Sequence, residues 1–331
     1  MNCGAKGIRV CRAAAILALT LAAPAAVFAD TAQGRFEKTL TVSGSVDLSV
    51  QSGSGSINVR TGGAGNVRVV ATIKARDTWG GGMSAAEKVK RIESNPPVVQ
   101  DGNIITIGKL EDRELQNNVS IQYEITTPAD TKLRSETGSG SMIIDGVKGP
   151  AELSTGSGGI TASSIGDMVR ANTGSGSIQL RGVKGSVRAS TGSGGIHADG
   201  VAGGFTGSTG SGSIEVQQVA AGDVDVHTGS GGITLTGVQG SLRARTGSGS
   251  IRAEGRPSGS WRIDSASGGL TVRLPQDMGF ELDAHSSNGN IYTAHEITMQ
   301  GSIRRRELRG KVRGGGPLVE LRTASGSIRI E

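Results

Sequence analysis

Four ionisable side chains lie on consecutive repeats of this chain, and together they could support acid–base chemistry. His197 and Asp199 lie two residues apart in a short extended segment. Arg181 precedes Asp199 by one repeat, and Glu215 follows His197 by one repeat. If consecutive repeats stack side by side, the four side chains gather in one patch, where a carboxylate and an imidazole could transfer protons. The same arrangement is typical of a solvated strand face with weak ion pairs between neighbouring coils. We therefore treat the patch as a surface feature and predict no catalytic residue.

Hydroxyl side chains form a second regular array. Thr173, Ser175 and Ser177 alternate with glycines, and the same string recurs in each repeat. On a flat face such rows could bind ice or a glycan surface. Glycines between hydroxyl residues are also typical of a turn closed by side-chain hydrogen bonds, and this is the structure that we expect.

Three other kinds of site are not expected. The glycine-rich strings lack the Gly-Lys-Ser/Thr sequence of a phosphate-binding loop. Calcium-binding nonapeptides need an Asp in each repeat, whereas Asp occurs here irregularly, at 145, 167, 199, 223 and 225. Both cysteines, Cys3 and Cys11, lie within the first 29 residues, so the rest of the chain has no thiol for catalysis or metal binding. We expect no cofactor and no metal.

A six-residue motif, T-G-S-G-[SG]-I with close variants, sets the positions of these side chains. It starts at Thr137 and restarts at 155, 173, 191, 209, 228 and 246, so that every step has the same length except the fifth, which is longer by one residue. A period this short and regular predicts a solenoid. Glycine makes up 55 of 331 residues, and because the glycines are phased with isoleucines they indicate turns and not a disordered linker. The repeat positions that we expect to be structural are Gly138, Gly156, Gly174, Gly192, Gly210, Gly229 and Gly247, with Ile160, Ile178, Ile196, Ile214, Ile233 and Ile251.

Each repeat contains two short segments of alternating apolar and polar residues. In the copy from Thr173, Ile178 and Leu180 alternate with polar residues, and Val187 and Ala189 do so nine residues later. Period-2 alternation bounded by glycines predicts two strands per coil. The predicted fold is therefore all-β: a single-chain parallel β-helix, or β-solenoid, of about 18 residues and two strands per coil, with one short helix in its N-terminal cap. Antiparallel hairpins on the same rhythm are the alternative.

The inward set of each coil follows from the same alternation. For the coil that begins at Thr209, the predicted inward residues are Ile214, Val216, Val219, Val224 and Val226.

The regular repeat is predicted to cover residues 137–264, and the regions before and after it have different roles. Residues 1–29 are predicted to be a signal peptide, with basic residues before the apolar run 13–27 and cleavage after Ala29. An uncleaved anchor is the alternative, but the run is shorter than the roughly 20 residues that a bilayer needs. Residues 30–136 are predicted to form a β-rich cap and the first part of the solenoid, with a helical insertion near 84–95. Residues 265–331 are predicted to form irregular coils and the C-terminal cap.

Charge and composition exclude some partners. Removing Lys6, Arg9 and Arg12 with the signal leaves 32 basic and 29 acidic residues, a net charge of +3. This balance, with an aromatic content of 2%, does not favour nucleic acid. No segment of the mature chain is expected to span a membrane. A glycan or an envelope protein is the expected kind of partner.

The motifs together resemble those of the bacterial putative-adhesin family, a β-helical domain of unknown function in exported and membrane-linked proteins. The resemblance rests on the string S-G-S-G-S-I-N-V at 52–59, the T-G-S-G-[SG]-I copies, the ending T-A-S-G-S-I at 323–328, and the strand-then-proline segments 125–128 and 272–275. It implies an exported, non-enzymatic, adhesin-like structural or binding module, periplasmic or secreted, and it supplies no catalytic residue. A carbohydrate-active β-helix enzyme and an ice- or surface-binding solenoid are the alternatives.

Overall fold

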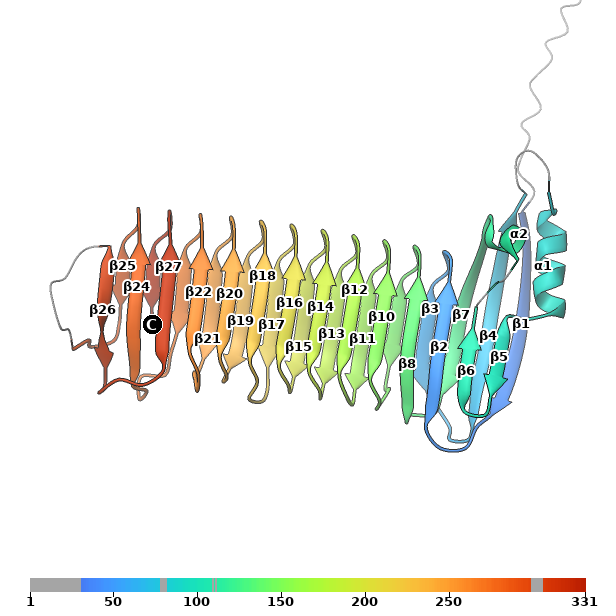
Figure 1. The fold of residues 1–331 in the computed structure, drawn as a ribbon, viewed down its shortest axis with the longest axis horizontal. Helices are drawn as coiled ribbons and strands as arrows, with labels where there is room; N and C mark the ends of the chain where they lie inside the picture. Colours follow the sequence, from blue (N-terminus) through green and yellow to red (C-terminus); the bar gives the residue numbers. More distant parts are fainter. Residues whose placement is uncertain (1–30, 78–81, 109, 111, 299–305) are drawn as a thin grey trace, which may run out of the picture.

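The protein is a long rod built from two sheets that face each other (Figure 1). The structure is a computed structural model, and it describes residues 31–77, 82–108, 110, 112–298 and 306–331. The predicted signal peptide and the cleavage position after Ala29 lie outside the described residues. Each sheet has 14 strands, and coils stack along the axis of the rod.

Sheet A follows one side of the rod from the N-terminal cap to the C-terminal cap. In spatial order its strands are β1 (Thr31–Thr41), β4 (Asn66–Arg76), β7 (Val119–Thr127), β3 (Ile57–Thr61), β9 (Met142–Asp145), β11 (Ile160–Ile165), β13 (Ile178–Val183), β15 (Ile196–Val201), β17 (Ile214–Gln218), β19 (Ile233–Val238), β21 (Ile251–Gly255), β23 (Leu270–Arg273), β28 (Ile328–Ile330) and β25 (Ile291–Thr293).

Sheet B follows the opposite side. In the same direction its strands are β5 (Val98–Asp101), β6 (Ile104–Ile107), β2 (Val46–Ser52), β8 (Thr131–Thr137), β10 (Ala151–Thr155), β12 (Val169–Thr173), β14 (Val187–Thr191), β16 (Phe205–Thr209), β18 (Val224–Thr228), β20 (Leu242–Thr246), β22 (Trp261–Ser265), β27 (Leu318–Thr323), β24 (Phe280–Ser286) and β26 (Glu307–Val312).

Strands of the repeat pair in parallel, and each residue lies opposite its counterpart in the next copy. Ile160 lies opposite Ile178 in sheet A, and Val169 lies opposite Val187 in sheet B. The predicted parallel β-solenoid with two strands per coil is therefore confirmed. Among the described strands, antiparallel pairing occurs only near the two ends of the rod, in the pairs β1–β4, β4–β7, β5–β6 and β24–β26.

The core is a thin layer of small and branched side chains between the two sheets. The repeat isoleucines from Ile160 to Ile251 are all at most 1% exposed. Large rings fit only where a neighbour is small: a Cβ on Gly207 would lie 2.6 Å from the ring of Phe205. Trp261 is also fully buried, and its indole N–H donates to the carbonyl of Gly240.

One predicted core residue was wrong. Val219 is 59% exposed, and Gln218 is buried in its place, opposite Val201 of the preceding coil. The reason is a missing bulge: Ala198 and Val201 of the preceding coil are three residues apart, with Gly200 between them at a φ of +71°, whereas the residues opposite them, Val216 and Gln218, are two apart. The inward corner position therefore falls one residue earlier in this coil, and its longer step is taken up after Gln218. The buried amide of Gln218 donates to the carbonyls of Gly203 and Gly222, which offsets part of the cost of burying it.

The order of coils in space differs from their order in the sequence at both ends. The coil of β2 and β3 lies between the coil of β6 and β7 and that of β8 and β9. At the other end, the final coil of β27 and β28 lies between β22–β23 and β24–β25. Both displaced coils carry a copy or variant of the motif, and each bonds to a neighbouring copy: Thr137 Oγ1 donates to the carbonyl of Gly55, and Thr323 Oγ1 donates to that of Gly268.

Two helices lie in the N-terminal cap, where one was predicted. α1 (Ala85–Ser94) begins after Ser84, whose hydroxyl accepts from the amide of Glu87, and it packs on β1 and β4 through Val89 and Ile92 (Figure 1). α2 (Arg113–Gln116), which the sequence did not predict, is a single turn between β6 and β7. Among the described residues, no helix is both long and apolar enough to cross a membrane.

Candidate functional site

The first hydroxyl of each motif holds the corner between the two sheets. Thr173 Oγ1 donates to the carbonyl of Gly158 in the preceding coil at 2.8 Å, and it accepts from the amide of Gly176 at 3.1 Å. The same pair of bonds recurs at every copy from Thr137 to Thr246. These threonines are at most 6% exposed. The predicted turn is confirmed, and the threonine row of the ice-binding alternative is not on the surface.

The motif glycines are required by the close approach of stacked coils. A Cβ on Gly174, the second motif residue, would lie 2.3 Å from the carbonyl oxygen of Gly156. At Gly176, the fourth residue, it would lie 1.9 Å from that of Gly158. Real Cβ atoms do not approach backbone this closely. The motif glycines therefore have a structural role, which is the role expected for Gly138 and its counterparts.

The predicted ionisable patch is present as a flat surface feature of sheet A. His197 Nδ1 lies 3.1 Å from Glu215 Oε2, and the two side chains are 45% and 62% exposed. Arg181 lies opposite Asp199 in the neighbouring strand, but within the described part of the chain they make no ion pair. Exposed pairs of this kind contribute little. In the described ranges, no group of three or more His, Cys, Asp or Glu could hold a metal ion.

The outer face of sheet B carries a second surface, which we call the polar track. It consists of Ser154, Asn172, Ser190 and Ser208, which lie opposite one another on successive strands. Ser190 Oγ and Ser208 Oγ lie 3.0 Å apart. The small side chains leave a flat strip with hydroxyl and amide groups at one per coil, about 4.8 Å apart.

Two arginines run beside the polar track. Arg170 and Arg188 are exposed and lie directly opposite each other on β12 and β14. Their row continues to Glu152, which already accepts two hydrogen bonds from Arg134, and to Thr206 on the other side. The Arg134 guanidinium holds the pKa of Glu152 below its ordinary value. Neither Arg170 nor Arg188 makes an ion pair among the described residues, so two like charges stand together.

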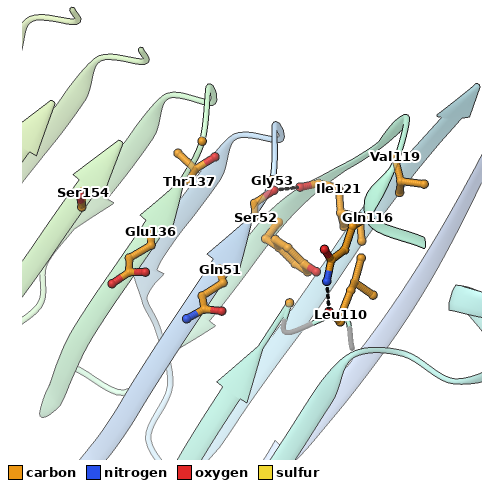
Figure 2. Close-up of a pocket in the computed structure, with 13 residues that line it drawn as sticks. Gln51, Ser52, Gly53, Leu110, Gln116, Val119, Ile121, Glu136, Thr137 and Ser154 are labelled. Carbon is orange, nitrogen blue, oxygen red and sulfur yellow. Dashed lines mark hydrogen bonds between the residues drawn. The ribbon is translucent and has the colours of Figure 1, made fainter. Parts of the chain in front are cut away.

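A hollow of about 640 Å³ lies where the cap meets the solenoid (Figure 2). In a regular coil the four residues T-G-S-G connect sheet B to sheet A, but β6 and β7 are separated by a longer segment, of which Gly108, Leu110 and residues 112–118 are described. The corner residues Ser52 and Thr137 line the hollow. Its remaining lining residues are Gln51, Gly53, Gly108, Leu110, Gln116, Val119, Ile121, Tyr123, Glu136, Gly138 and Ser154.

Local hydrogen bonds fix the walls of the hollow. Ser52 Oγ donates to the carbonyl of Ile121 at 2.8 Å, and Gln116 Nε2 donates to that of Leu110 at 2.6 Å (Figure 2). Gly108 has a φ of +87°, which favours glycine, and a Cβ there would lie 1.8 Å from the Gln51 carbonyl.

One polar group on the wall has no protein partner. Tyr123 is 0% exposed, and its hydroxyl makes no hydrogen bond to any described residue. The hydroxyl lies beside Gly108, where a Cβ would be 3.2 Å from it. Burial raises the pKa of Tyr123 above its ordinary value.

Sequence reasoning missed the polar track, the arginine pair and the hollow. The arginine pair had a signal, because Arg170 and Arg188 occupy the same outward position of consecutive repeats. Tyr123 could be assigned an inward position from the alternation of β7. The hollow had no such signal, because it depends on which coil lies next to β7.

Comparison with known protein families gives a match to the C-terminal part of the chain. Residues 186–331 match a protein family described as Toastrack DUF4097. This bears out the resemblance to the bacterial adhesin-like family. A comparison with curated proteins found no match.

Three solved structures are similar to 90% of this chain. A putative cell adhesion protein from Clostridium sporogenes is 12% identical, with 99% of its chain covered and a TM-score of 0.24. Putative adhesins from Bacteroides fragilis and Parabacteroides distasonis are 9% and 10% identical, with 97% of each chain covered and TM-scores of 0.28 and 0.29.

Proposed function

We propose that the protein, whose residues 186–331 match the family described as Toastrack DUF4097, is an exported, non-enzymatic, adhesin-like binding module of the bacterial cell envelope. The outer face of sheet B is the surface that we assign to its ligand, an extended glycan. The observation that carries this proposal is the polar track, which repeats similar chemistry on successive coils.

The chemistry of the polar track suits a polymer of sugars. Hydroxyl and amide groups both donate and accept hydrogen bonds, and a glycan presents hydroxyls at every unit. The outward positions of β10, β12, β14 and β16 hold no aromatic residue, whereas protein interfaces concentrate their binding energy in aromatic and arginine anchors. An envelope protein is therefore the second choice of partner.

Arg170 and Arg188 add charge to the same face. Two like charges directly opposite each other on neighbouring strands are unfavourable. A hydroxyl or anionic group of a ligand that lies between the guanidinium groups would offset this cost, since each guanidinium offers five N–H donors. Charge complementarity thus favours a glycan with some anionic units.

Binding measurements on paired variants test this proposal. The mature chain would be passed over immobilised acidic and neutral polysaccharides at two salt concentrations. We expect R170Q/R188Q to weaken binding by about tenfold or more, because charge-assisted hydrogen bonds are lost. R181Q/R252Q removes the same charge from sheet A and should bind as the wild type does. Equal losses in both double variants, or no binding to any polysaccharide, would refute the assignment.

Two further measurements test the export and the lack of catalysis. Cell fractionation of the chain expressed with and without residues 1–29 should find protein outside the cytoplasm only when residues 1–29 are included in the expressed chain. Incubation with a bound polysaccharide should release no reducing ends. A release that H197A/D199A abolishes without unfolding the protein would replace the binding role by the carbohydrate-active alternative.

A further inference from the structure

The hollow at the cap is lined by motif corners, by strand residues and by the segment between β6 and β7. Its floor is formed by two motif corners, those of Ser52 and Thr137, whose hydroxyls are fully engaged in corner bonds. Leu110 and Gln116 line another side, where Gln116 Nε2 donates a hydrogen bond to the carbonyl of Leu110. Its volume falls in the range of small-molecule sites.

The Tyr123 hydroxyl lacks a hydrogen-bond partner, which indicates a ligand with a polar group. A buried hydroxyl without a partner costs free energy, and few such groups persist in folded proteins without a reason. Tyr123 is fully buried, lines the hollow and has no protein partner among the described residues. A ligand hydroxyl in the hollow would supply the missing hydrogen bond.

A row of three polar side chains forms the opposite side. Gln51 lies opposite Glu136, and Glu136 lies opposite Ser154, on the successive strands β2, β8 and β10 (Figure 2). None of the three side chains makes a hydrogen bond to another described residue. An amide, a carboxylate and a hydroxyl can each form a hydrogen bond with a sugar hydroxyl. Leu110, Val119 and Ile121 offer apolar surface for the C–H face of the ring.

Charge narrows the class of ligand. Glu136 is the one carboxylate among the described lining residues, and no lysine or arginine lines the hollow with it. A carboxylate beside the ligand disfavours an anionic group. We propose that this hollow binds one neutral sugar unit.

The position of Ser154 indicates that the sugar in the hollow is the terminal unit of a glycan. Ser154 lines the hollow and is also the first residue of the polar track. A glycan whose terminal unit occupies the hollow would continue directly over Asn172, Ser190 and Ser208. This part of the inference rests on the proposed function, because a free sugar could fill the hollow equally well.

The test is titration calorimetry on the full mature chain. The probes are glucose, galactose, mannose and N-acetylglucosamine, each as the monosaccharide and as a linear tetrasaccharide. We expect at least one monosaccharide to bind, and Y123F to weaken it by about tenfold through loss of one hydrogen bond. S135A is the matched control, since Ser135 also has a buried hydroxyl without a partner but does not line the hollow. It should bind as the wild type does.

The tetrasaccharide distinguishes the two sources of the sugar. Tighter binding of the tetrasaccharide, reduced by R170Q/R188Q, indicates the end of a glycan, whereas equal binding of both probes indicates a free sugar. Monosaccharide binding without binding of any polysaccharide would refute the proposed function but not the hollow. Binding that Y123F leaves unchanged, or no binding by any of these sugars, would overturn the assignment of the hollow.

Discussion

Replacing Gly176 by alanine tests whether backbone contact between coils dictates the motif. The new Cβ would lie 1.9 Å from the carbonyl oxygen of Gly158, whereas ordinary contact begins at 3.4 Å. The two coils would therefore have to separate at this corner by the difference between these two distances. Because the φ of Gly176 is not positive, the substitution probes the collision alone and not backbone strain.

The magnitude follows from the hydrogen bonds at the corner. The bond from Thr173 Oγ1 to Gly158 O is 2.8 Å, and that from Gly174 N to Gly156 O is 3.0 Å. A separation of this size would take both beyond hydrogen-bond distance. Each buried group left without a partner costs about 1–3 kcal/mol, so we expect a loss of about 3–5 kcal/mol.

Gly195 is the matched control one coil away. It is the fifth motif residue, and a Cβ there would lie 3.4 Å from the carbonyl of Ser213. Alanine at this position should be neutral or should stabilise by up to ~1 kcal/mol, because it restricts the unfolded chain. Urea unfolding followed by circular dichroism, with hydrogen exchange to detect opening of single coils, measures both variants. Stabilities of G176A and G195A within about 1 kcal/mol of each other would refute the reasoning.

Three further changes test other parts of the structure. T209V removes a corner hydroxyl and should cost about 1–3 kcal/mol in urea unfolding, whereas T206V on the outer face of the same strand should change little. Burial raises the pKa of Tyr123 in the folded state, so ionisation of Tyr123 should leave the free energy of unfolding unchanged below about pH 10 and lower it above that by up to ~1.4 kcal/mol per pH unit. Y123F should remove this fall in alkaline melts, whereas Y292F, at an exposed tyrosine, should not. Deleting residues 318–331 should raise the hydrogen exchange of β24 toward that of unfolded chain, since β27 is its parallel neighbour; unchanged exchange would contradict the strand order.

Local features of the chain could be predicted because they repeat. The alternation around Ile178 placed its side chain in the core, where it is fully buried, and the hydroxyl and glycine pattern from Thr173 predicted the corner. The prediction failed at Val219 because this coil lacks the bulge that precedes the corner of its neighbour, so that the inward position moves to Gln218. Periodicity alone does not show where in a coil a residue is lost or inserted.

The surface patch was predicted only in part. The pairing of strands from consecutive repeats placed His197 beside Glu215 and Arg181 beside Asp199, and the structure has both neighbours. Only the first pair is in contact. Exposed side chains are held weakly, so register predicts which residues are neighbours but not which of them interact.

The sequence by itself determined the coil: its length, its two strands, its inward isoleucines and the glycines at its corners. Each of these depends on contacts between identical positions of adjacent copies, which a periodic sequence specifies completely. Tertiary structure alone decided the order of the coils at the ends, where Thr137 bonds to Gly55 and Thr323 bonds to Gly268 across long stretches of chain. Since every motif copy can stack on every other, the sequence leaves that order open. The hollow beside Tyr123 exists because of the order that the fold adopts.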